Sequence, residues 1–567
     1  MIRPMIVAAL AVLLLAGAAP PPSVRYEVSP VMGPEGLEAV AVAVTFEGEA
    51  DGETRLILPN DWGGHPELWK HLEGLSVEGA TMSEAGPAAR VLKHRPGARL
   101  TVRYRLKSGY PADPAPDTGN PYRPVVRPGW FQLLGNSAFV EPDASAERAA
   151  SVRFRGWPAD WTLASDLDHQ AMGRPLVVGD VIESITVGGT DLRVERRRLP
   201  GGELRVAVRG TWDFTDAAFA DQVAGIISGQ RKFWGDMEEP YFVSLIPLTA
   251  EQGWRSTGGT GRGDAFALFS TRNATAADLR NLLAHEHAHS WIPRRVGVMG
   301  SPEQADYWFS EGFTDFYATR TLVRSGLMSL EDYAAWLNEV LEGHDASPAR
   351  GRPNSAIVAG FWTDPTVQKL PYRRGVLLAL LWDHRIREGS AGRRDLDDVV
   401  LAMRDRHVAA PQGVPLRANL VETMMTVGGF DPRQDIQRHV EAGEEIALPP
   451  GLLAACGVIE EAERGRFDRG WEAVRQGDAW VLKSVRPGSR AHQAGLREGM
   501  VLISRQAGTP GDERQEYALK VRDGDGERVY RYMPVGEGRY RLRSFSLKAG
   551  MDEPAREACR RRLAGEI

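Results

Sequence analysis

The segment 275–297 reads TAADLRNLLAHEHAHSWIPRRVG, and it decides how the centre of this chain folds. Thr275 followed by Asp278 is a capping-box pattern at the start of an apolar repeat, which predicts a helix beginning at this point. Pro293 cannot continue a helix and predicts where it ends. The histidine-rich motif HEHAH, residues 285–289, is therefore predicted to lie towards the end of one helix.

His285 and His289 are spaced so that both side chains face the same way. At about 100° per residue, these positions lie within about 40° of each other on a helix surface. Two imidazoles on one face can bind a single ion, and Glu286 beside them is placed to act as a general base. His287 falls on the far side of the helix, so we predict that it packs as a polar residue and does not bind the metal.

A second motif supplies the rest of a metal site. The segment WFSEGFTDFYATR, residues 308–320, places Glu311 on the next predicted helix and Asp315 one turn later. Catalytic zinc commonly has three protein ligands and one open position, so we predict that His285, His289 and Glu311 bind one zinc ion per chain. Asp315 is expected to accept a hydrogen bond from a ligand histidine. The alternatives are a histidine-rich helix without metal and a plain surface acid at position 315.

The chemistry expected of such a site is hydrolysis of a peptide bond. Zinc activates water and polarises a carbonyl, while Glu286 is expected to take a proton from the attacking water and to deliver it to the leaving amine. The developing oxyanion needs a further donor. We predict that Tyr372, in the segment PYRRG at 371–375, is this donor. The alternative is a tyrosine with a structural role only.

Composition excludes several classes of protein. Hydrophobic residues make up 43% and charged residues 25% of the 567 positions, which is ordinary for globular proteins and excludes disordered and fibrous chains. The 69 Lys and Arg against 75 Asp and Glu leave a net charge of -6, so we expect no nucleic-acid partner. Two cysteines are too few for a disulfide scaffold or a cysteine-rich zinc module.

Residues 1–19 have the three parts of a secretory signal peptide. Arg3 supplies the positive charge, an apolar run follows at 5–15, and Ala16-Gly17-Ala18 is a small-x-small cleavage pattern. At about 1.5 Å per residue this run is too short to span a hydrocarbon core of about 30 Å. No later stretch is apolar enough to span. We expect an exported protein, periplasmic or secreted, with no membrane span in the mature chain.

The chain is predicted to be a multidomain α+β protein. Alternating apolar residues at 100–106 and a hairpin around Pro200-Gly201-Gly202 predict an N-terminal β-sandwich-like domain over 20–212. Helical periodicity then predicts a mainly helical catalytic domain over 213–446. Short strands with glycine turns predict a small β domain over 447–548, and a helical tail follows at 549–567.

The motifs resemble a known family. HEHAHSWIPRRVG, WFSEGFTDFYATR, PYRRGVLLALLWDHRIRE and DLDDVV together are similar to the glycyl-aminopeptidase family of HExxH-plus-Glu zinc peptidases. The resemblance implies a thermolysin-like catalytic domain between an N-terminal β domain and a C-terminal PDZ domain. It also implies that His285, His289 and Glu311 bind zinc and that Glu286 is the catalytic acid and base. Tyr372 matches the family's transition-state tyrosine.

The chain departs from that family at two places. The family usually has an aromatic residue where His287 stands. It also carries a Gly-Gly-Leu-Glu-His segment before the zinc helix, whose Glu contacts the substrate's free amine. Here the corresponding stretch, 258–266, reads GGTGRGDAF and contains no Glu. We predict that Asp264 replaces it as the amine anchor and that Phe266–Ser270 forms a strand that pairs with substrate. The alternative for Asp264 is a turn residue.

Residues 480–500 resemble part of a PDZ domain. The matching segments are WVLKSV, PGS, AHQAGL and GM, with Met500 where an Asp is usual. Such domains bind a peptide by adding it as a strand to a sheet edge, so a peptide or protein ligand is a candidate partner here. The alternative is a β module that only packs on the catalytic domain.

Cys456 and Cys559 flank this module. The ends of small β domains tend to lie close together, and export would place the chain in an oxidising compartment. We therefore predict a disulfide between them, with two buried thiols as the alternative.

The prediction for function is zinc-dependent peptide hydrolysis, as an aminopeptidase acting on N-terminal Gly or Ala. A zinc endopeptidase on the same site is one alternative. A silent scaffold that captures peptides through its PDZ-like module is another. Such a scaffold has no physical need for the four residues His285, Glu286, His289 and Glu311.

Overall fold

The structure is a computed structural model. It describes residues 23–116, 119–235, 239–250, 255–476, 479–524 and 526–566, so the predicted signal peptide at 1–19 lies outside the described residues. The chain divides into two compact units. The first unit comprises residues 1–224 and 237–282, and the second unit comprises residues 225–236 and 283–567.

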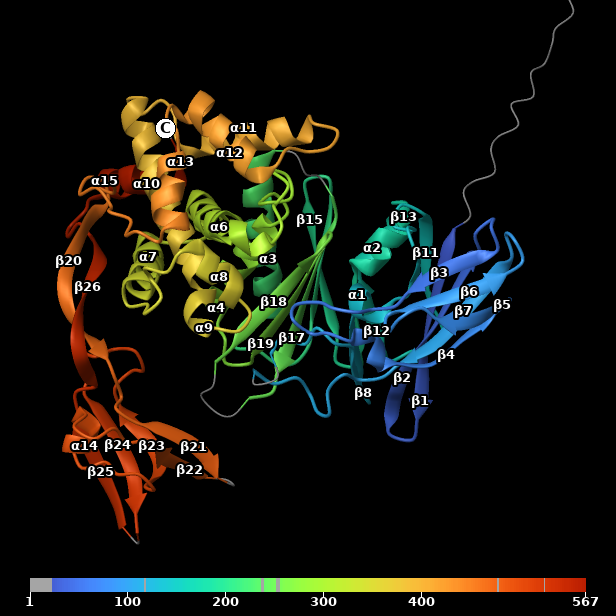
Figure 1. Cartoon of the computed structure of the whole chain (residues 1–567), viewed down its shortest axis with the longest axis horizontal. Coiled ribbons are helices and arrows are strands. Elements are labelled where there is room, and N and C mark those ends of the chain that lie inside the picture. The colour runs from blue at the N-terminus through green and yellow to red at the C-terminus, as the bar shows by residue number, and fades with distance from the viewer. Residues whose placement is uncertain are drawn as a thin grey trace, which may run out of the picture. The chain divides into compact units, whose positions relative to one another are not determined.

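The first unit begins with two sheets that share one hydrophobic core (Figure 1). Their strand orders are β13-β11-β1-β2-β7-β4 and β10-β3-β6-β5. In β7 the side chains of Leu100, Val102 and Tyr104 are buried and their neighbours are not, as the alternation in the sequence predicts. The strands are β1 (Val24–Gly33), β2 (Gly36–Glu47), β3 (Glu53–Ile57), β4 (Leu72–Glu78), β5 (Ala80–Glu84), β6 (Ala89–His94), β7 (Arg99–Leu106), β10 (Glu141–Pro142), β11 (Ala149–Phe154) and β13 (Leu176–Val177).

A third sheet of the first unit has the order β12-β14-β9-β8. Its strands are β8 (Val125–Arg127), β9 (Trp130–Leu134), β12 (Thr162–Ser165) and β14 (Ile185–Gly189). Short helical segments connect these sheets: η1 (Leu68–His71), α1 (Gly135–Ala138), η3 (Asp166–Met172) and α2 (Val178–Ile182).

The fourth sheet of the first unit has the order β15-β16-β17-β19-β18. Its strands are β15 (Arg193–Leu199), β16 (Gly202–Val208), β17 (Tyr241–Leu248), β18 (Thr257–Arg262) and β19 (Ala265–Thr271). The hairpin expected around residues 200–202 is present as β15 and β16. Because β16 pairs in parallel with β17, this sheet crosses the domain boundary that we expected between residues 212 and 213.

The edge of this sheet differs from the prediction. The strand that we expected to pair with substrate, Phe266–Ser270, lies within β19, which already has β17 on one side and β18 on the other. The edge strand is β18, a glycine-rich segment whose low β-propensity conceals it in the sequence. Any peptide added to this side of the sheet would therefore pair with β18.

Helix α3 (Asp216–Trp234) connects β16 to β17, and helix α4 (Ala276–Ala288) follows β19 in sequence. The capping box of α4 forms as predicted: the Asp278 backbone N–H donates to Thr275 Oγ1 at 3.2 Å, and the Thr275 N–H donates to the Asp278 carboxylate at 2.7 Å. Helix α4 ends at Ala288, five residues before Pro293, and the chain continues in turns.

Helices make up most of the second unit. They are α5 (Tyr307–Ser310), α6 (Gly312–Arg324), α7 (Leu330–Asp345), α8 (Asn354–Gly360), α9 (Pro365–Gln368), α10 (Leu370–Gly389), α11 (Leu396–Val408), α12 (Leu416–Thr423) and α13 (Arg433–Asp435), with the short turns η4 (Glu303–Asp306), η5 (Met424–Gly428) and η6 (Ile436–Glu441). Helix α6 is buried along almost its whole length, and its buried Arg320 is paired with the carboxylates of Asp383 and Asp395. Within the described residues no helix is long and apolar enough to cross a membrane.

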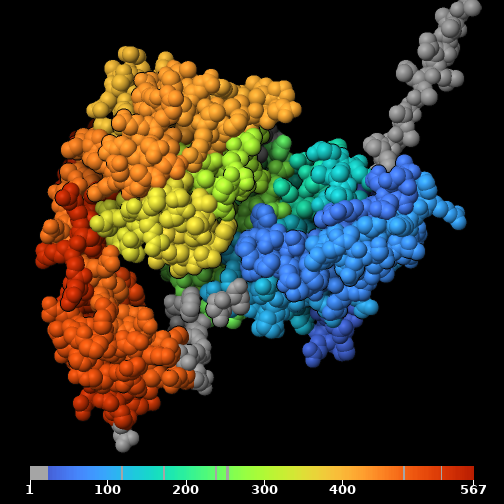
Figure 2. Space-filling model, viewed as in Figure 1, coloured from blue at the N-terminus to red at the C-terminus, as the bar shows by residue number. Residues whose placement is uncertain are grey.

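The C-terminal part of the second unit is a β module, seen in orange to red in Figures 1 and 2. A two-stranded ribbon of β20 (Gly457–Phe467) and β26 (Val535–Leu547) leads to a sheet with the order β21-β22-β23-β24-β25. The strands of this sheet are β21 (Glu472–Gln476), β22 (Ala479–Lys483), β23 (Val501–Ala507), β24 (Tyr517–Asp523) and β25 (Gly526–Tyr532). Among the described residues of this module the only helix is α14 (Arg490–Gln493). The PDZ resemblance therefore stays a prediction.

The predicted disulfide between Cys456 and Cys559 is confirmed. It ties the start of β20 to the last described helix, α15 (Glu553–Ala564). Arg562 of α15 donates to the buried Asp383 of α10 at 2.5 Å. The Gly565 that ends α15 has φ 74° and lies so close to the Arg320 guanidinium of α6 that a Cβ there would clash. The chain thus returns to the helical core after the β module.

Candidate metal centre

His285 and His289 converge at the C-terminal end of α4. Their Nε2 atoms are 3.1 Å apart and the ring planes cross at 89°. His285 Nδ1 lies 2.7 Å from Asp315 Oδ1, and His289 Nδ1 lies 2.8 Å from the carbonyl oxygen of Ile292. Because both partners accept, in the neutral form of each ring Nδ1 carries the proton and Nε2 offers a lone pair to the same point.

Glu311 completes the group. Its Oε2 lies 3.3 Å from His285 Nε2 and 3.6 Å from His289 Nε2, and one ligand atom from each residue falls within 4.8 Å of the others. Glu311 stands at the junction of α5 and α6, so its position is set by the first turn of a buried helix. Two imidazole nitrogens and one carboxylate oxygen are the donor set of catalytic zinc sites. These residues fit a single zinc ion.

The neighbouring charges shift the pKa values of two members of this group. Burial disfavours a charged imidazole, but Asp315 and Glu311 outweigh it and raise the pKa of His285 well above its ordinary value. Burial likewise disfavours the Glu311 carboxylate, yet His289 and His285 hold its pKa well below the usual range. The surrounding residues therefore stabilise positive charge at this point, as binding a divalent cation requires.

Asp315 occupies the position that the sequence indicates. It lies one turn after Glu311 on α6 and accepts from His285 Nδ1. This contact holds the imidazole ring in one orientation and one tautomer. Glu286, the next residue after His285 on α4, is partly exposed.

Tyr372 reaches the group because α6 and α10 touch. At their crossing, a Cβ added to Gly375 would lie 1.8 Å from the Trp308 carbonyl oxygen and 2.7 Å from the Gly312 Cα, so only glycine allows this approach. Gly312 directly follows Glu311, and Gly375 lies three residues after Tyr372. The glycine contact therefore brings the tyrosine to the metal ligands.

The Tyr372 ring lies nearly parallel to that of His285, with 6.0 Å between centroids. Burial, followed by the carboxylates of Glu311, Asp315 and Glu286, raises the pKa of Tyr372 well above its ordinary value. The hydroxyl therefore stays protonated over the physiological pH range. A protonated hydroxyl beside the metal ligands can donate a hydrogen bond to a developing oxyanion.

His287 points away from the metal ligands, as the helical periodicity indicates. It is 2% exposed, its Nδ1 lies 2.6 Å from Gln230 Oε1, and its ring packs edge-on against Trp291 at 5.2 Å. Burial and the nearby Arg231 lower the pKa of His287 to about 3, so the ring is neutral. Sequence reasoning did not single out Gln230. A glutamine among the apolar positions of α3 is the signal that could have found it.

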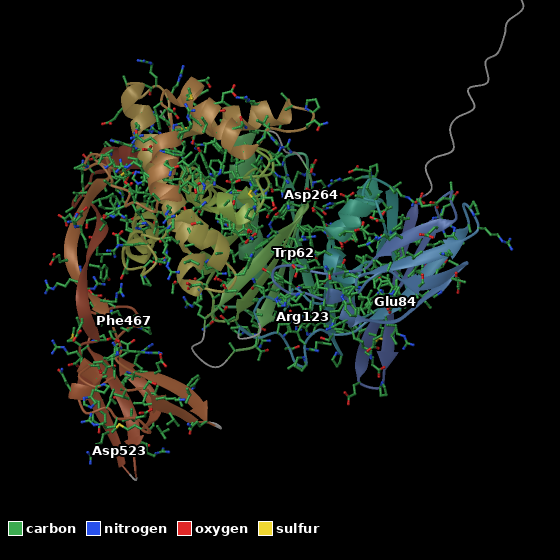
Figure 3. All side chains as sticks on the ribbon, in the orientation of Figure 1. Trp62, Glu84, Arg123, Asp264, Phe467 and Asp523 are labelled. Atoms are coloured by element: carbon green, nitrogen blue, oxygen red, sulfur yellow. A yellow bond between two sulfur atoms is a disulfide. The ribbon has the colours of Figure 1, made fainter. Side chains whose placement is uncertain are left out.

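Asp264 has a different partner from the one that we predicted. Labelled in Figure 3, it lies in the turn between β18 and β19, and its carboxylate forms an ion pair with Arg174 within the first unit. Gly263, beside it, donates its backbone N–H to Glu183 at 3.2 Å. The charge of Asp264 is therefore already balanced by a guanidinium, and its role towards a substrate amine stays a prediction.

One family model matches the segment that contains these residues, and solved structures are similar to the chain in fold. Residues 278–357, which contain all three metal ligands, match the family model described as M61 glycyl aminopeptidase. The fold is similar to the crystal structure of an aminopeptidase N family protein from Idiomarina loihiensis, with a TM-score of 0.70 and 15% identity over 95% of this chain and 100% of that one. An M1 zinc metallopeptidase from Deinococcus radiodurans has a TM-score of 0.46 and 17% identity, over 76% of this chain and 95% of that one. No curated protein matches the chain.

The fold and the site together define a zinc metallopeptidase. Within this class, the segment that carries the ligands is similar to the glycyl aminopeptidases. Tyr372 and Asp264 both lie outside the matched residues, so this match does not bear on their roles.

Proposed function

We propose that this protein is a zinc aminopeptidase that removes small residues, Gly or Ala, from the N-termini of peptides. The observation that carries the proposal is the convergence of His285, His289 and Glu311, with Glu286 beside them on α4. The match of this segment to the glycyl aminopeptidase family supports the choice of peptide substrates with a free N-terminus.

His285, His289 and Glu311 would hold the zinc, which supplies Lewis-acid activation of water and of the scissile carbonyl. Glu286 takes a proton from the attacking water and passes it to the leaving amine. Tyr372 donates its hydroxyl to the oxygen on which negative charge develops. Asp315 keeps His285 in the tautomer whose Nε2 lone pair faces the metal. Glu286→Gln should therefore retain zinc and lose hydrolysis.

An aminopeptidase must recognise a charged amine, and burying an ammonium without a partner is costly. Asp264 is our sequence-based candidate for this partner, although in the structure its carboxylate forms an ion pair with Arg174. Asp264→Ala compared with Arg174→Ala tests the assignment. If Asp264 binds the amine, only the first change raises KM for free peptides. If the ion pair is purely structural, both changes have the same effect.

The deciding experiment measures hydrolysis of matched peptides with free and N-acetylated termini, beginning with Gly, Ala, Leu or Phe. The proposal expects cleavage of free Gly and Ala peptides and none of the acetylated ones. Equal cleavage of both would instead identify a zinc endopeptidase. Purified protein that holds zinc and cleaves neither series would favour the silent scaffold.

We also propose that the chain is exported, to the periplasm or outside the cell. The signal-like residues 1–19 support this, and so does the Cys456–Cys559 disulfide, because such bonds persist in oxidising compartments. Fractionation of cells producing the full chain, together with the N-terminal sequence of the mature protein, tests both expectations.

A second candidate function concerns the β module. A cavity of about 350 Å³ opens there, lined by the apolar side chains of Trp471, Leu502 and Tyr517, by Arg469 and Arg505, and by Asp468, whose carboxylate pairs with Arg486. Phe467, labelled in Figure 3, lies at the end of β20 and also lines it. We propose that this cavity binds an extended peptide with an apolar residue and a negative charge. Loss of peptide binding in Trp471→Ala, with hydrolysis unchanged, would support this role.

A further inference from the structure

Gln230 is a fully buried polar side chain at an apolar position of an amphipathic helix. In α3 the residues Val223, Ile226, Ile227 and Trp234 form the buried stripe, and Gln230 continues it at 1% exposure. A buried amide at such a position is costly unless each of its polar atoms finds a partner. The partners of this amide all belong to the two helices that carry the zinc ligands.

The carboxamide of Gln230 has one orientation that satisfies its neighbours. Its Nε2 donates to the Ala284 carbonyl of α4 at 2.6 Å and to Thr321 Oγ1 of α6 at 3.4 Å. Thr321 can accept because its own hydroxyl proton goes to the Tyr317 carbonyl at 2.7 Å. Oε1 is then left to accept from His287 Nδ1 at 2.6 Å. The donors and acceptors are matched at every contact.

These contacts surround the catalytic segment. Ala284 and His287 flank His285 and Glu286 on α4, while Thr321 lies on α6, the helix whose N-cap is Glu311. The Gln230 amide thus contacts the Ala284 carbonyl beside His285 and the His287 side chain beside Glu286. It also contacts Thr321 on the helix that follows Glu311. Rotation of α4 about its axis would stretch the bonds to Ala284 and His287.

We infer that Gln230 is a positioning residue for the zinc site, acting through Ala284, His287 and Thr321 and touching neither metal nor substrate. Removing a group that hydrogen-bonds a metal ligand directly typically lowers metal affinity about 10- to 100-fold. Gln230 is one contact further from the ligands, so Gln230→Leu, which keeps the size and loses the amide, should raise the zinc dissociation constant about tenfold, at the low end of this range. It should also alter the visible absorption spectrum of the cobalt-substituted protein, because that spectrum reports ligand geometry.

The same pair of helices provides a matched control. Gln222 lies two turns earlier on α3, and its Nε2 donates to the Ala276 carbonyl of α4 at 2.8 Å, at the end of α4 far from His285. Gln222→Leu removes an equivalent bond between the same helices and should change neither zinc affinity nor the cobalt spectrum. If both substitutions change zinc affinity and the cobalt spectrum equally, Gln230 acts only in packing the two helices, and the inference is overturned.

A double substitution separates positioning from loss of stability. Gln230→Leu combined with His287→Phe replaces both polar partners by apolar groups of similar shape, which can be nearly neutral for stability. The inference expects the double variant to fold and to bind zinc about tenfold more weakly than wild type, because the bonds to Ala284, His287 and Thr321 are still absent. A double variant that binds zinc within about threefold of wild type, or that fails to fold, contradicts it. Zinc affinity and the cobalt spectrum do not depend on peptide hydrolysis, so these results are distinct from a failure of the proposed function.

Discussion

Arg543 of β26 and Asp345 at the end of α7 form a buried ion pair across 198 residues of sequence. The Arg543 Nη2 and Nε donate to the two carboxylate oxygens at 2.6 and 3.0 Å, and the Arg543 backbone N–H adds a third bond at 2.9 Å. The two side chains are 3% and 6% exposed. This pair fastens the β20–β26 ribbon to the helices.

Arg543→Ala should destabilise the protein strongly. The substitution leaves the Asp345 carboxylate buried without its partner, which typically costs about 3–5 kcal/mol. Arg541, two residues earlier on the same strand, pairs with Glu461 at 3.3 Å, but both side chains are exposed. Arg541→Ala should therefore cost less than about 1 kcal/mol. Urea unfolding of both variants measures the difference, and equal costs would contradict this account.

The same pair predicts how stability depends on pH. Burial alone would raise the pKa of Asp345, but hydrogen bonds from His344 and Arg543 outweigh it and lower this pKa to about 2. A carboxylate with a depressed pKa stabilises the fold above its unfolded pKa of about 3.9 and loses this contribution as the pH falls. We expect a loss of about 2 kcal/mol between about pH 4 and pH 2. Unfolding of wild type and Asp345→Asn against pH should show the slope reduced in the variant.

Asp315 should control zinc affinity through His285. Asp315→Ala removes the acceptor that orients the imidazole, so the zinc dissociation constant should rise about 10- to 100-fold. Asp315→Asn keeps an acceptor and loses the charge, so its zinc dissociation constant should lie between those of wild type and Asp315→Ala. Competition with a chromogenic chelator measures all three proteins. If Asp315→Ala binds zinc as tightly as wild type, the contact between Asp315 and His285 does not orient this ligand.

Tyr372→Phe should lower kcat more than it changes KM. Losing one donor to an oxyanion costs about 2.7–4 kcal/mol of barrier, or about 10²- to 10³-fold in kcat. Zinc content should stay at one per chain, since the hydroxyl is not a ligand. Steady-state kinetics on a free Gly or Ala peptide checks this. An unchanged kcat would assign Tyr372 to the structural alternative.

The Cys456–Cys559 bond should stabilise the attachment of α15. Removing a native disulfide typically costs about 2–5 kcal/mol, so the double Ser variant should unfold at lower urea. Reductant should lower the urea midpoint of wild type to that of the double Ser variant and leave the midpoint of the variant unchanged. A wild-type midpoint that does not respond to reductant, with the bond shown to be reduced, would contradict this.

The residues of the metal group were predictable because their relationships are local. The i, i+4 spacing of His285 and His289 is a property of any helix, and Glu311 follows in the next one. The edge strand was missed because the order of strands in a sheet depends on residues far apart in sequence. In addition, the glycine-rich sequence of β18 does not predict a strand. Gln230 and His287 are 57 residues apart, and the sequence does not show which buried polar groups meet. Asp264 was assigned without knowledge of Arg174, 90 residues earlier.

Helix α15 has a consequence for the order in which the protein matures. Arg562 is synthesised 179 residues after the Asp383 with which it pairs, and Gly565 lies against Arg320. A nascent chain that has produced every zinc ligand still lacks the guanidinium that balances part of the buried acidic charge on α10. The helical core can therefore acquire its metal ligands long before it acquires its final electrostatic balance.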